Sequence, residues 1–554
     1  MESSKTPVLV EKSATGLGPP KQKGTGASSH PTDATNKPGI ANPVLMPRPD
    51  RFIQDFATQV DVRLDQHDKA YIVGHDAGNL RAIYLSSREC ASQLRDLGIQ
   101  SGLKARNGDI AEWREYLQAH AEKLNRVTQV WQRVAKIDGG IEIDLGDDKY
   151  TRVRITAAKV EIVANGSKTL FYRPPTSRPM AMPAEVGNLT LLDKYLNFHP
   201  QSLMLFIAYL TYTLATPKRP SAKFLILVIH GPQGIGKSMA SKIAIRLIDP
   251  SVIDVQVMPD NKVDLTIAAQ NAHVLCYDNL REFRHWLADL LCIASTGGSI
   301  STRQLYSDAK QQVHQLHVAL ILNGIHAFID QPDLAQRTLT LNMQSFDESS
   351  RKSEADMLHE FELELPAIQR GLFDLISNIL LHLPTAEVTN PERMIDFVRW
   401  LAGYEKACGL APGIFQAAYS EALCLGQRDS LLDNLLGTML LEFAEKHIDC
   451  SWSGTPTQLL DALNNIVTLR EQRSRDWPQT VISLSKRLSP LQAPLLSQGI
   501  RVELPRAKHR MITITKDTVS LTPMVSAKQA PADTPKDSNT VSADDWPDFK
   551  PYAF

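Results

Sequence analysis

The glycine-rich stretch GPQGIGKS at residues 231–238 constrains the fold of this chain more than any other part of its sequence. It has the spacing G-x-x-x-x-G-K-S and directly follows an apolar run, FLILVI at 224–229, that is typical of a strand buried on both faces. Glycines permit a tight turn that aims backbone N–H groups at phosphate oxygens, and the helix that opens at Gly236 adds the positive end of its dipole. The stretch therefore predicts a strand, a phosphate-binding loop and a helix that hold a nucleoside triphosphate.

Two side chains of this motif have defined roles in nucleotide chemistry. Lys237 reaches the β- and γ-phosphates, and Ser238 ligates Mg²⁺, so we expect ATP and Mg²⁺ as cofactors. The residues predicted to line the nucleotide site are Gly231, Pro232, Gln233, Gly234, Ile235, Gly236, Lys237, Ser238 and Met239. The alternative is a glycine-rich turn with an exposed lysine.

Length and composition are those of an ordinary soluble protein with several domains. The 554 residues are 43% hydrophobic and 22% charged, which is enough for about three or four domains with proper cores. The six cysteines are scattered without a C-x-x-C pair, as expected of reduced thiols and not of disulfides or zinc ligands. The longest apolar helix candidate, 203–216, is too short to span a bilayer. We expect a cytoplasmic protein without a membrane segment.

The N-terminal half is expected to contain a tail and two small regions before the nucleotide-binding domain. Residues 1–50 are rich in Pro, Gly, Ser and Thr and predict a disordered tail. Residues 51–126 are expected to be mainly helical, because Ile110, Trp113 and Leu117 keep helical spacing. Residues 127–182 alternate with a period near two and predict a small β-rich module. Its acids Asp144, Asp147 and Asp148 suggest either a metal site or, preferably, a hairpin-end loop.

The rest of the chain is expected to contain the ATPase, a helical region and a winged helix. The fold class is thus multidomain α/β, with a P-loop ATPase at 183–360, helices at 361–450, a winged helix at 451–515 and a disordered tail at 516–554. The winged helix is indicated by two helices followed by the strands IRVEL and RMITIT around a basic turn. The acidic and aromatic end, DDWPDFKPYAF, is either an inert tail or a docking peptide for a replication partner.

Further residues needed for ATP hydrolysis follow the glycine-rich motif at workable distances. Asp278 ends a second apolar strand, HVLCYDNL, where a carboxylate can hold Mg²⁺ through water. The acid that usually follows is replaced by Asn279, so either Asp278 serves both metal and water, or Glu282 assists, or hydrolysis is slow. Asn323 ends a third strand and could sense the γ-phosphate. Arg337 either reaches the γ-phosphate of a neighbouring subunit or forms a surface salt bridge.

Basic residues in two places predict contact with DNA. Between the second and third strands lies a β-hairpin, ISTRQLYSDAKQQVHQLH, whose conspicuous cations are Arg303 and Lys310. The winged helix holds the clearest basic patch of the chain, between residues 470 and 510. Its predicted phosphate contacts are Lys486, Arg487, Arg506, Lys508 and Arg510. The alternatives are an exposed hairpin turn, and a winged domain that packs on the motor or binds protein.

This order of motifs resembles the superfamily-3 helicases, ring-forming AAA+ ATPases of viruses, phages and plasmids. GPQGIGKS corresponds to their Walker A motif, VLCYDN to Walker B, TGGSISTRQLYSDAK to the B′ segment with its hairpin, LILNG to motif C, and Arg337 to the arginine finger. The chain is more closely similar to the helicase half of phage and mobile-element primase-helicases and to related bacterial ATP-binding proteins. That resemblance covers about residues 127–515 and includes GGIEIDLGDD, LFYRP and RMIDFVRWL.

The resemblance implies a homo-hexameric ring with ATP at the subunit interfaces. Lys237, Ser238, Asp278 and Asn323 would act within one subunit, and Arg337, with Arg303 as a helper, on its neighbour. Hydrolysis would move the hairpins that carry Lys310 along one DNA strand in the central channel, while the winged helix engages duplex or origin DNA. Asn279 departs from the family pattern, and no N-terminal segment resembles a primase catalytic domain.

Two functions of different classes fit these observations. The first is an ATP-dependent DNA helicase or translocase that replicates a phage, plasmid or integrated element without its own primer synthesis. The second is an ATP-switched DNA-binding initiator, loader or defence ATPase without processive unwinding, which Asn279 favours. A small-molecule kinase is disfavoured because no acceptor-site or lid signature is evident.

Overall fold

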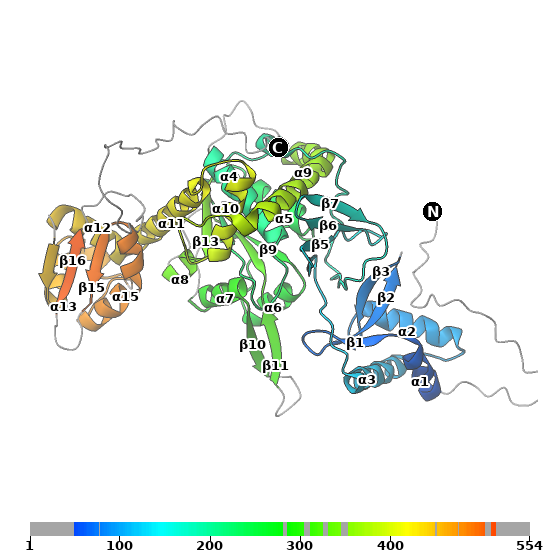
Figure 1. The fold of residues 1–554 in the computed structure, drawn as a ribbon. Coiled ribbons are helices and arrows are strands. Elements are labelled where there is room, and N and C mark those ends of the chain that lie inside the picture. The colour runs from blue at the N-terminus through cyan, green and yellow to red at the C-terminus, as the bar shows by residue number, and fades with distance from the viewer. Residues whose placement is uncertain are drawn as a thin grey trace, which may run out of the picture. The chain divides into compact units, whose positions relative to one another are not determined.

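The computed structural model describes residues 49–76, 78–280, 285–303, 311–324, 331–344, 353–448, 451–474, 476–504 and 511–516 (Figure 1). The chain forms two compact units. The first consists of the described residues up to Trp131 together with Ala164–Tyr172, and the second of Gln132–Val163 and the described residues from Arg173 onward. Among the described helices, none combines the length and apolar character that a bilayer span requires.

The first unit is a small α+β fold. Three helices, α1 (Pro49–Gln59), α2 (Arg88–Gln100) and α3 (Asn107–Leu124), accompany an antiparallel sheet in the order β1 (Val62–Leu64), β2 (Ala70–Asp76), β3 (Asn79–Tyr84). The prediction of a mainly helical region is therefore wrong for residues 62–84. The strands are short and rich in β-branched and aromatic residues, and a hairpin turn with Gly78 at φ 82° joins β2 to β3.

A four-stranded parallel sheet forms the centre of the second unit. Its order is β13 (Thr338–Asn342), β8 (Ile226–His230), β12 (Ala319–Gly324), β9 (Val274–Leu280), and every neighbouring pair is parallel. Successive residues of β8 enter different cores: Leu227 and Ile229 pack on one face, Ile226 and Val228 on the other. The sheet is thus covered on both faces, as the apolar runs in the sequence predict.

Helices cover the two faces of this parallel sheet. The core on one face includes residues of α4 (Pro200–Leu214), α5 (Lys237–Ile248), α9 (Glu354–His382), α10 (Ile395–Ala407) and α11 (Ile414–Asp433). The core on the other face includes residues of α6 (Lys262–Gln270), α7 (His285–Thr296) and α8 (Pro332–Ala335). Short 3₁₀ turns at Leu189–Lys194 and Leu383–Thr385 complete the helical elements of this part.

An antiparallel sheet precedes the parallel one in the second unit. It has the order β4 (Val134–Ile137), β5 (Gly140–Asp144), β6 (Arg152–Thr156), β7 (Lys159–Val163), and it packs against α9. The strands confirm the predicted β-hairpins. The predicted single module at 127–182 is divided, however, because residues 164–172 pair with Arg81 and Trp131 of the first unit.

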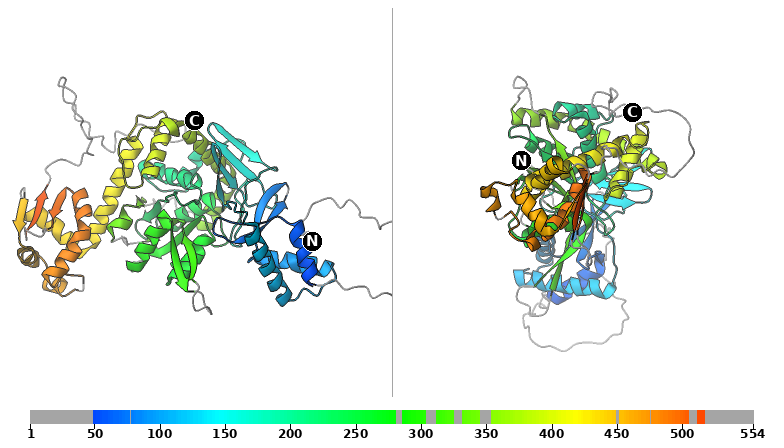
Figure 2. Two further views of the ribbon diagram at one scale, coloured as in Figure 1. Left: turned by 60° about the horizontal axis from the view of Figure 1, so that its bottom comes forward. Right: turned by 90° about the vertical axis from the view of Figure 1, so that its left-hand side faces the viewer.

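The hairpin predicted between the second and third parallel strands is confirmed. Strands β10 (Gly298–Arg303) and β11 (Gln311–Leu316) pair antiparallel over six residue pairs from Gly298 opposite Leu316 to Arg303 opposite Gln311. They project as a two-stranded arm beside α6 and α7 (Figures 1 and 2).

The C-terminal elements have a core of their own. They are α12 (Leu435–His447), β14 (Ser451–Gly454), α13 (Pro456–Asn464), α14 (Leu469–Gln472), α15 (Val481–Ser497), β15 (Ile500–Glu503) and β16 (Ile512–Lys516). The strands form an antiparallel sheet in the order β14-β16-β15. A capping box begins α13, since Thr455 and Gln458 exchange hydrogen bonds. Leu436 and Phe443 of α12 belong to this core, so the predicted boundary at 450 lies one helix too late.

Candidate nucleotide site and DNA-contacting elements

The glycine loop, residues 231–236, joins β8 to α5 as predicted. Its three glycines adopt positive φ angles, 144° at Gly231, 83° at Gly234 and 89° at Gly236, which side-chain-bearing residues rarely adopt. A Cβ at Gly231 would also lie 2.3 Å from Cδ1 of Ile235, a buried residue of the same loop. The loop therefore depends on glycine for both conformation and space, as a backbone cradle for phosphate requires.

Lys237 begins α5 and lies across the glycine loop. Its Nζ donates hydrogen bonds to the carbonyl oxygens of Gly231 and Pro232, each at 2.7 Å. Burial lowers the pKa of this ammonium group, and the nearby carboxylate of Asp278 opposes the shift. The cation is thus held at the phosphate-binding end of the helix, where the dipole also favours an anion.

Ser238 and Asp278 lie together at the carboxyl ends of the parallel strands. The Ser238 hydroxyl donates to Oδ2 of Asp278 at 2.7 Å, although 40 residues separate them in sequence. Asp278 lies near the end of β9, and the carboxyl ends of parallel strands meet at one edge of a sheet. A hydroxyl beside a carboxylate is an oxygen set that suits Mg²⁺, so these two residues fit the predicted metal role. Met239, also predicted here, is buried in α5.

Asn279 has a left-handed backbone with φ 59° and an exposed side chain. Its N–H donates to Oδ1 of Asp278 at 2.6 Å and to Oδ1 of Asn323 at 3.3 Å. Asparagine tolerates this conformation better than most residues, which gives a local physical reason for asparagine at the position where an acid was expected. Glu282, the other predicted helper, lies outside the described residues.

Asn323 is the residue before the last of β12 and is fully buried. Its Nδ2 donates to the Ser241 hydroxyl on α5 at 3.0 Å, while its Oδ1 accepts from the backbone of Asn279. In this structure its amide therefore links α5 to the end of β9. Sequence reasoning missed Ser241, whose only signal is its place three residues after Ser238 on the same helix.

Arg337 lies at the opposite end of the parallel sheet from the glycine loop. It directly precedes β13, whose first residue Thr338 pairs with Ile226, whereas Asn342 pairs with His230 at the loop end. Four residues of strand separate these levels by about 13 Å. The Arg337 side chain bonds Asp333 at 3.2 Å, which matches the salt bridge considered as its alternative role. It lies far from the glycine loop of its own chain.

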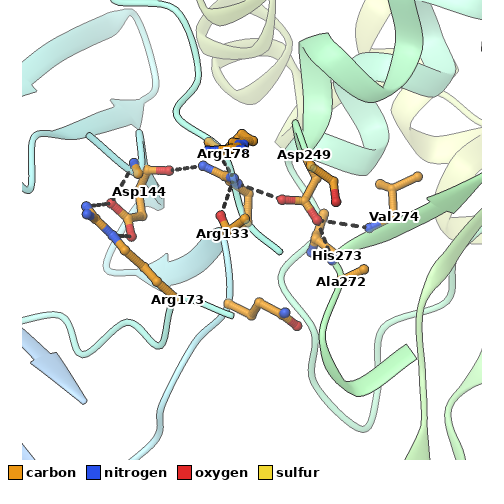
Figure 3. Close-up of polar contacts among 12 residues, drawn as sticks. Arg133, Asp144, Arg173, Arg178, Asp249, Ala272, His273 and Val274 are labelled. Carbon is orange, nitrogen blue, oxygen red and sulfur yellow. Dashed lines mark hydrogen bonds and ion pairs between the residues drawn. The ribbon is translucent and has the colours of Figure 1, made fainter. Parts of the chain in front are cut away.

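A buried polar network connects the antiparallel sheet to the parallel one (Figure 3). Arg133 bonds Asp249 at 2.8 Å and donates to the backbone oxygens of Asp144 and Arg178 at 2.9 Å each. Asp249 ends α5, and its other carboxylate oxygen accepts from the backbone N–H of His273 at 2.6 Å, directly before β9. The network thus fixes the far ends of the two elements that carry Ser238 and Asp278.

The acids considered as a metal site have other partners. The Asp144 carboxylate accepts from Arg173 at 2.6 and 2.7 Å and from buried Arg152, while Asp147 accepts from Thr151. Burial acts to raise the pKa of Asp144, but the arginines outweigh it and lower that pKa. No cluster of three metal-ligating side chains occurs within the described ranges. Asp147 and Asp148 lie between the paired strands β5 and β6, as the hairpin-loop interpretation predicts.

The predicted DNA contacts lie on two separate elements. Arg303 is the last residue of β10, and Lys310, which precedes β11 in the sequence, is outside the described residues. Lys486 and Arg487 lie on α15, where Lys486 is exposed and Arg487 donates to the backbone of Asp476. Arg506, Lys508 and Arg510, between β15 and β16, also lie outside the described residues. The structure therefore keeps Lys486 as an accessible candidate.

Two family models match this chain. Residues 189–424, which hold the parallel sheet, the glycine loop and the hairpin, match the actinomycete integrative conjugative element replication protein. Residues 436–532 match the C-terminal domain of the same replication protein, AICE RepA. Together the two matches span more than half of the chain. The chain belongs to this family of replication proteins.

The boundary between the two matched ranges lies close to the boundary between the hydrophobic cores of the replication protein. Lys237, Asp278, Asn323 and Arg337 fall within the first match, and the C-terminal match begins within α12, where the C-terminal core also begins. This agreement supports a C-terminal boundary before α12, not after it.

Comparison with solved structures gives only distant likeness. Two structures of the C-terminal region of NrS-1 align with 12% and 11% identity, covering 83% and 84% of this chain and 97% and 98% of theirs, at TM-scores of 0.35 and 0.33. These scores are too low to establish a common fold. No curated protein matches the chain.

Proposed function

We propose that this replication protein is an ATP-dependent DNA helicase or translocase that works as a ring of identical subunits, a hexamer by its resemblance to superfamily-3 helicases. The observation that carries the proposal is the division of the ATPase residues between two ends of one sheet. Lys237, Ser238 and Asp278 gather at the loop end, and Arg337 lies at the other. A site that needs all four is complete only when a second copy supplies the arginine.

The residues of the loop end fit ATP with Mg²⁺. The glycine loop would cradle the phosphates, Lys237 would neutralise the β- and γ-oxygens, and Ser238 with Asp278 would hold Mg²⁺, whose chemistry is to offset developing phosphate charge. Asn323 and Ser241 would fix the end of β9 against α5, so that Asp278 keeps its place during turnover. Arg337 of an adjacent copy would stabilise the transition-state charge.

The DNA-facing parts follow from the positions of the two basic elements. The β10–β11 arm extends beyond the core that holds the glycine loop, so Lys310, which the sequence analysis assigns to the turn between the two strands, would contact a strand that the ring encloses. The C-terminal elements, with α15 followed by the hairpin β15–β16, would form a winged helix that engages duplex DNA through Lys486 and its neighbours.

A second candidate is an ATP-switched initiator or loader that assembles on DNA with little turnover. Asn279 favours it, because no carboxylate stands at the position next to Asp278 to polarise an attacking water. The two functions differ in what ATP hydrolysis accomplishes.

Unwinding of a forked DNA by the full-length protein tests the proposal. We expect wild-type protein to unwind the fork with ATP, and Lys237→Ala to abolish unwinding. Lys242→Ala is the matched control, since Lys242 lies on the same helix but pairs with Glu354. Wild-type protein that hydrolyses ATP without DNA stimulation or unwinding in any oligomeric form would contradict the helicase. Near-zero turnover with tight ATP-dependent assembly would favour the initiator.

A further inference from the structure

One carboxylate, that of Asp333, holds two arginines from distant parts of the sequence. Arg337 places Nε and Nη2 at 3.3 and 3.2 Å from Oδ2 of Asp333. Arg393 places Nη1 at 2.6 Å from Oδ1 of the same residue and donates to Oε1 of Gln336 at 2.8 Å. The two guanidinium groups therefore lie side by side across one carboxylate.

This cluster carries a net positive charge. Burial acts to raise the pKa of Asp333, but a hydrogen bond from Cys292 and the charges of Arg337 and Arg393 outweigh it and lower that pKa, so the carboxyl is ionised. Burial and the neighbouring carboxylate raise the pKa of the Cys292 thiol to about 12, so the thiol is neutral. Two cations facing one anion leave one positive charge, and paired arginines suit a phosphate group.

Backbone hydrogen bonds hold the chain at Arg337 and next to Arg393. The Arg337 carbonyl accepts from Ile226 of β8 at 3.0 Å, and its N–H donates to Leu334 at 2.9 Å. Arg393 is followed by buried Met394, whose carbonyl accepts from the first turn of α10. A guanidinium group attached to a hydrogen-bonded backbone loses little further conformational freedom when a ligand binds.

The two arginines differ in exposure. Arg337 contacts Asp333 through two nitrogens, and 14% of its side chain is exposed. Arg393 contacts Asp333 and Gln336 through Nη1 alone, and 39% of its side chain is exposed. Through their shared carboxylate both lie at the end of the sheet opposite the glycine loop, so neither is placed to serve the nucleotide of its own chain.

We propose that Arg393 is a second arginine that acts on the neighbouring subunit: with Arg337 it forms a two-guanidinium site for the phosphates of a nucleotide held by an adjacent copy. Asp333 is a positioning residue that aligns the pair. The inference rests on the proposed function, because it needs a nucleotide at Lys237 of the next subunit.

Mixing two inactive full-length variants tests the transfer between subunits. Arg393→Ala keeps an intact glycine loop and Lys237→Ala keeps both arginines. We expect Arg393→Ala alone to lose at least about tenfold in ATP turnover while still binding a fluorescent ATP analogue like wild type. Equal mixing should restore about a quarter of wild-type turnover, the share of interfaces that join an intact loop to an intact Arg393. Arg393→Lys, which keeps charge without the planar fork, should recover part of the activity.

The controls separate this inference from the proposed function. Arg399→Ala removes an exposed arginine six residues further on α10 and should leave turnover unchanged. Either of two results would overturn the role of Arg393 without affecting the proposed function. The first is wild-type turnover by Arg393→Ala. The second is a mixture that stays inactive although wild type is active and both variants keep its thermal stability. Wild-type protein that neither hydrolyses ATP nor assembles with ADP and aluminium fluoride would overturn the proposed function and this inference with it.

Discussion

At the scale of single residues, Asn279 contacts its neighbours in the site through its backbone N–H, while its side chain is exposed. The sequence shows that an acid is missing at this position, but it does not show that the position has φ 59°. The N–H of Asn279 bonds Asp278 and Asn323, and its own side chain is exposed. We infer that this residue acts through its backbone.

Replacing Asn279 tests that inference. Asn279→Gly keeps the N–H and adopts positive φ without strain, so we expect ATP turnover close to that of wild type. Asn279→Val should destabilise the protein by about 1–2 kcal/mol and lower turnover, because a β-branched residue, unlike asparagine, is strained in the left-handed region. Steady-state turnover and urea unfolding measure both effects. Loss of turnover in the glycine variant at unchanged stability would assign a catalytic role to the Asn279 side chain.

Motif spacing predicted the loop-end residues because each follows an apolar strand. Lys237, Ser238, Asp278 and Asn323 could be located because the carboxyl ends of parallel strands share one edge. Asp333 and Arg393 could not, because their contact joins a four-residue helix to a loop 60 residues later, and no periodicity reports such a pair.

At the scale of elements, the Arg133 network explains how α5 and β9 keep their positions. Arg133 and Asp249 are 2% and 10% exposed in their side chains, and each has further hydrogen bonds to backbone. Burial also lowers the pKa of neighbouring His273 to about 4, so its ring is neutral and donates through Nε2 to the carbonyl of Thr213. The far ends of α5 and β9 are therefore fixed by polar groups that are almost entirely buried.

Arg133→Met should strongly destabilise the second unit. It leaves the Asp249 carboxylate buried without its cation, which costs about 3–5 kcal/mol. Urea unfolding, monitored by tryptophan fluorescence, measures the loss of stability. The double variant Arg133→Met, Asp249→Asn should recover part of the lost stability, because it also removes the buried charge. Lys159→Met, which removes an exposed pair with Glu161, is the control and should change stability by less than about 1 kcal/mol. Equal stability of the Arg133 and Lys159 variants would contradict the proposed importance of the network.

Elements with a clear apolar pattern were predicted better than short strands and than a helix that directly follows other helices. The apolar runs predicted β8, β9 and β12, and the segment between the last two was correctly expected to form the β10–β11 hairpin. The strands at 62–84 were missed because helical spacing in α3 dominated that region, and α12 was assigned to the wrong core because its apolar stripe resembles those of the helices before it.

At the scale of the whole molecule, DNA binding should depend on the C-terminal elements. Lys486 is exposed on α15, and each lost phosphate contact lowers the slope of log affinity against log salt by about one unit. We expect Lys486→Ala to lower this slope for duplex DNA. Lys446→Ala on α12 is the matched control, since Lys446 pairs with Glu442. An unchanged slope for Lys486→Ala would favour a C-terminal domain that packs on the motor or binds protein.

A ring helicase of the proposed kind completes its nucleotide site between copies while DNA passes through the ring. Imaging full-length protein with a non-hydrolysable ATP analogue and forked DNA tests this most directly. We predict a closed ring with one strand passing the β10–β11 arms, and with Arg337 and Arg393 of each subunit facing the nucleotide at Lys237 of the next. A monomer that binds the nucleotide and DNA, or a ring in which DNA lies outside the arms and both arginines face away from every nucleotide, would contradict a ring helicase with a shared nucleotide site.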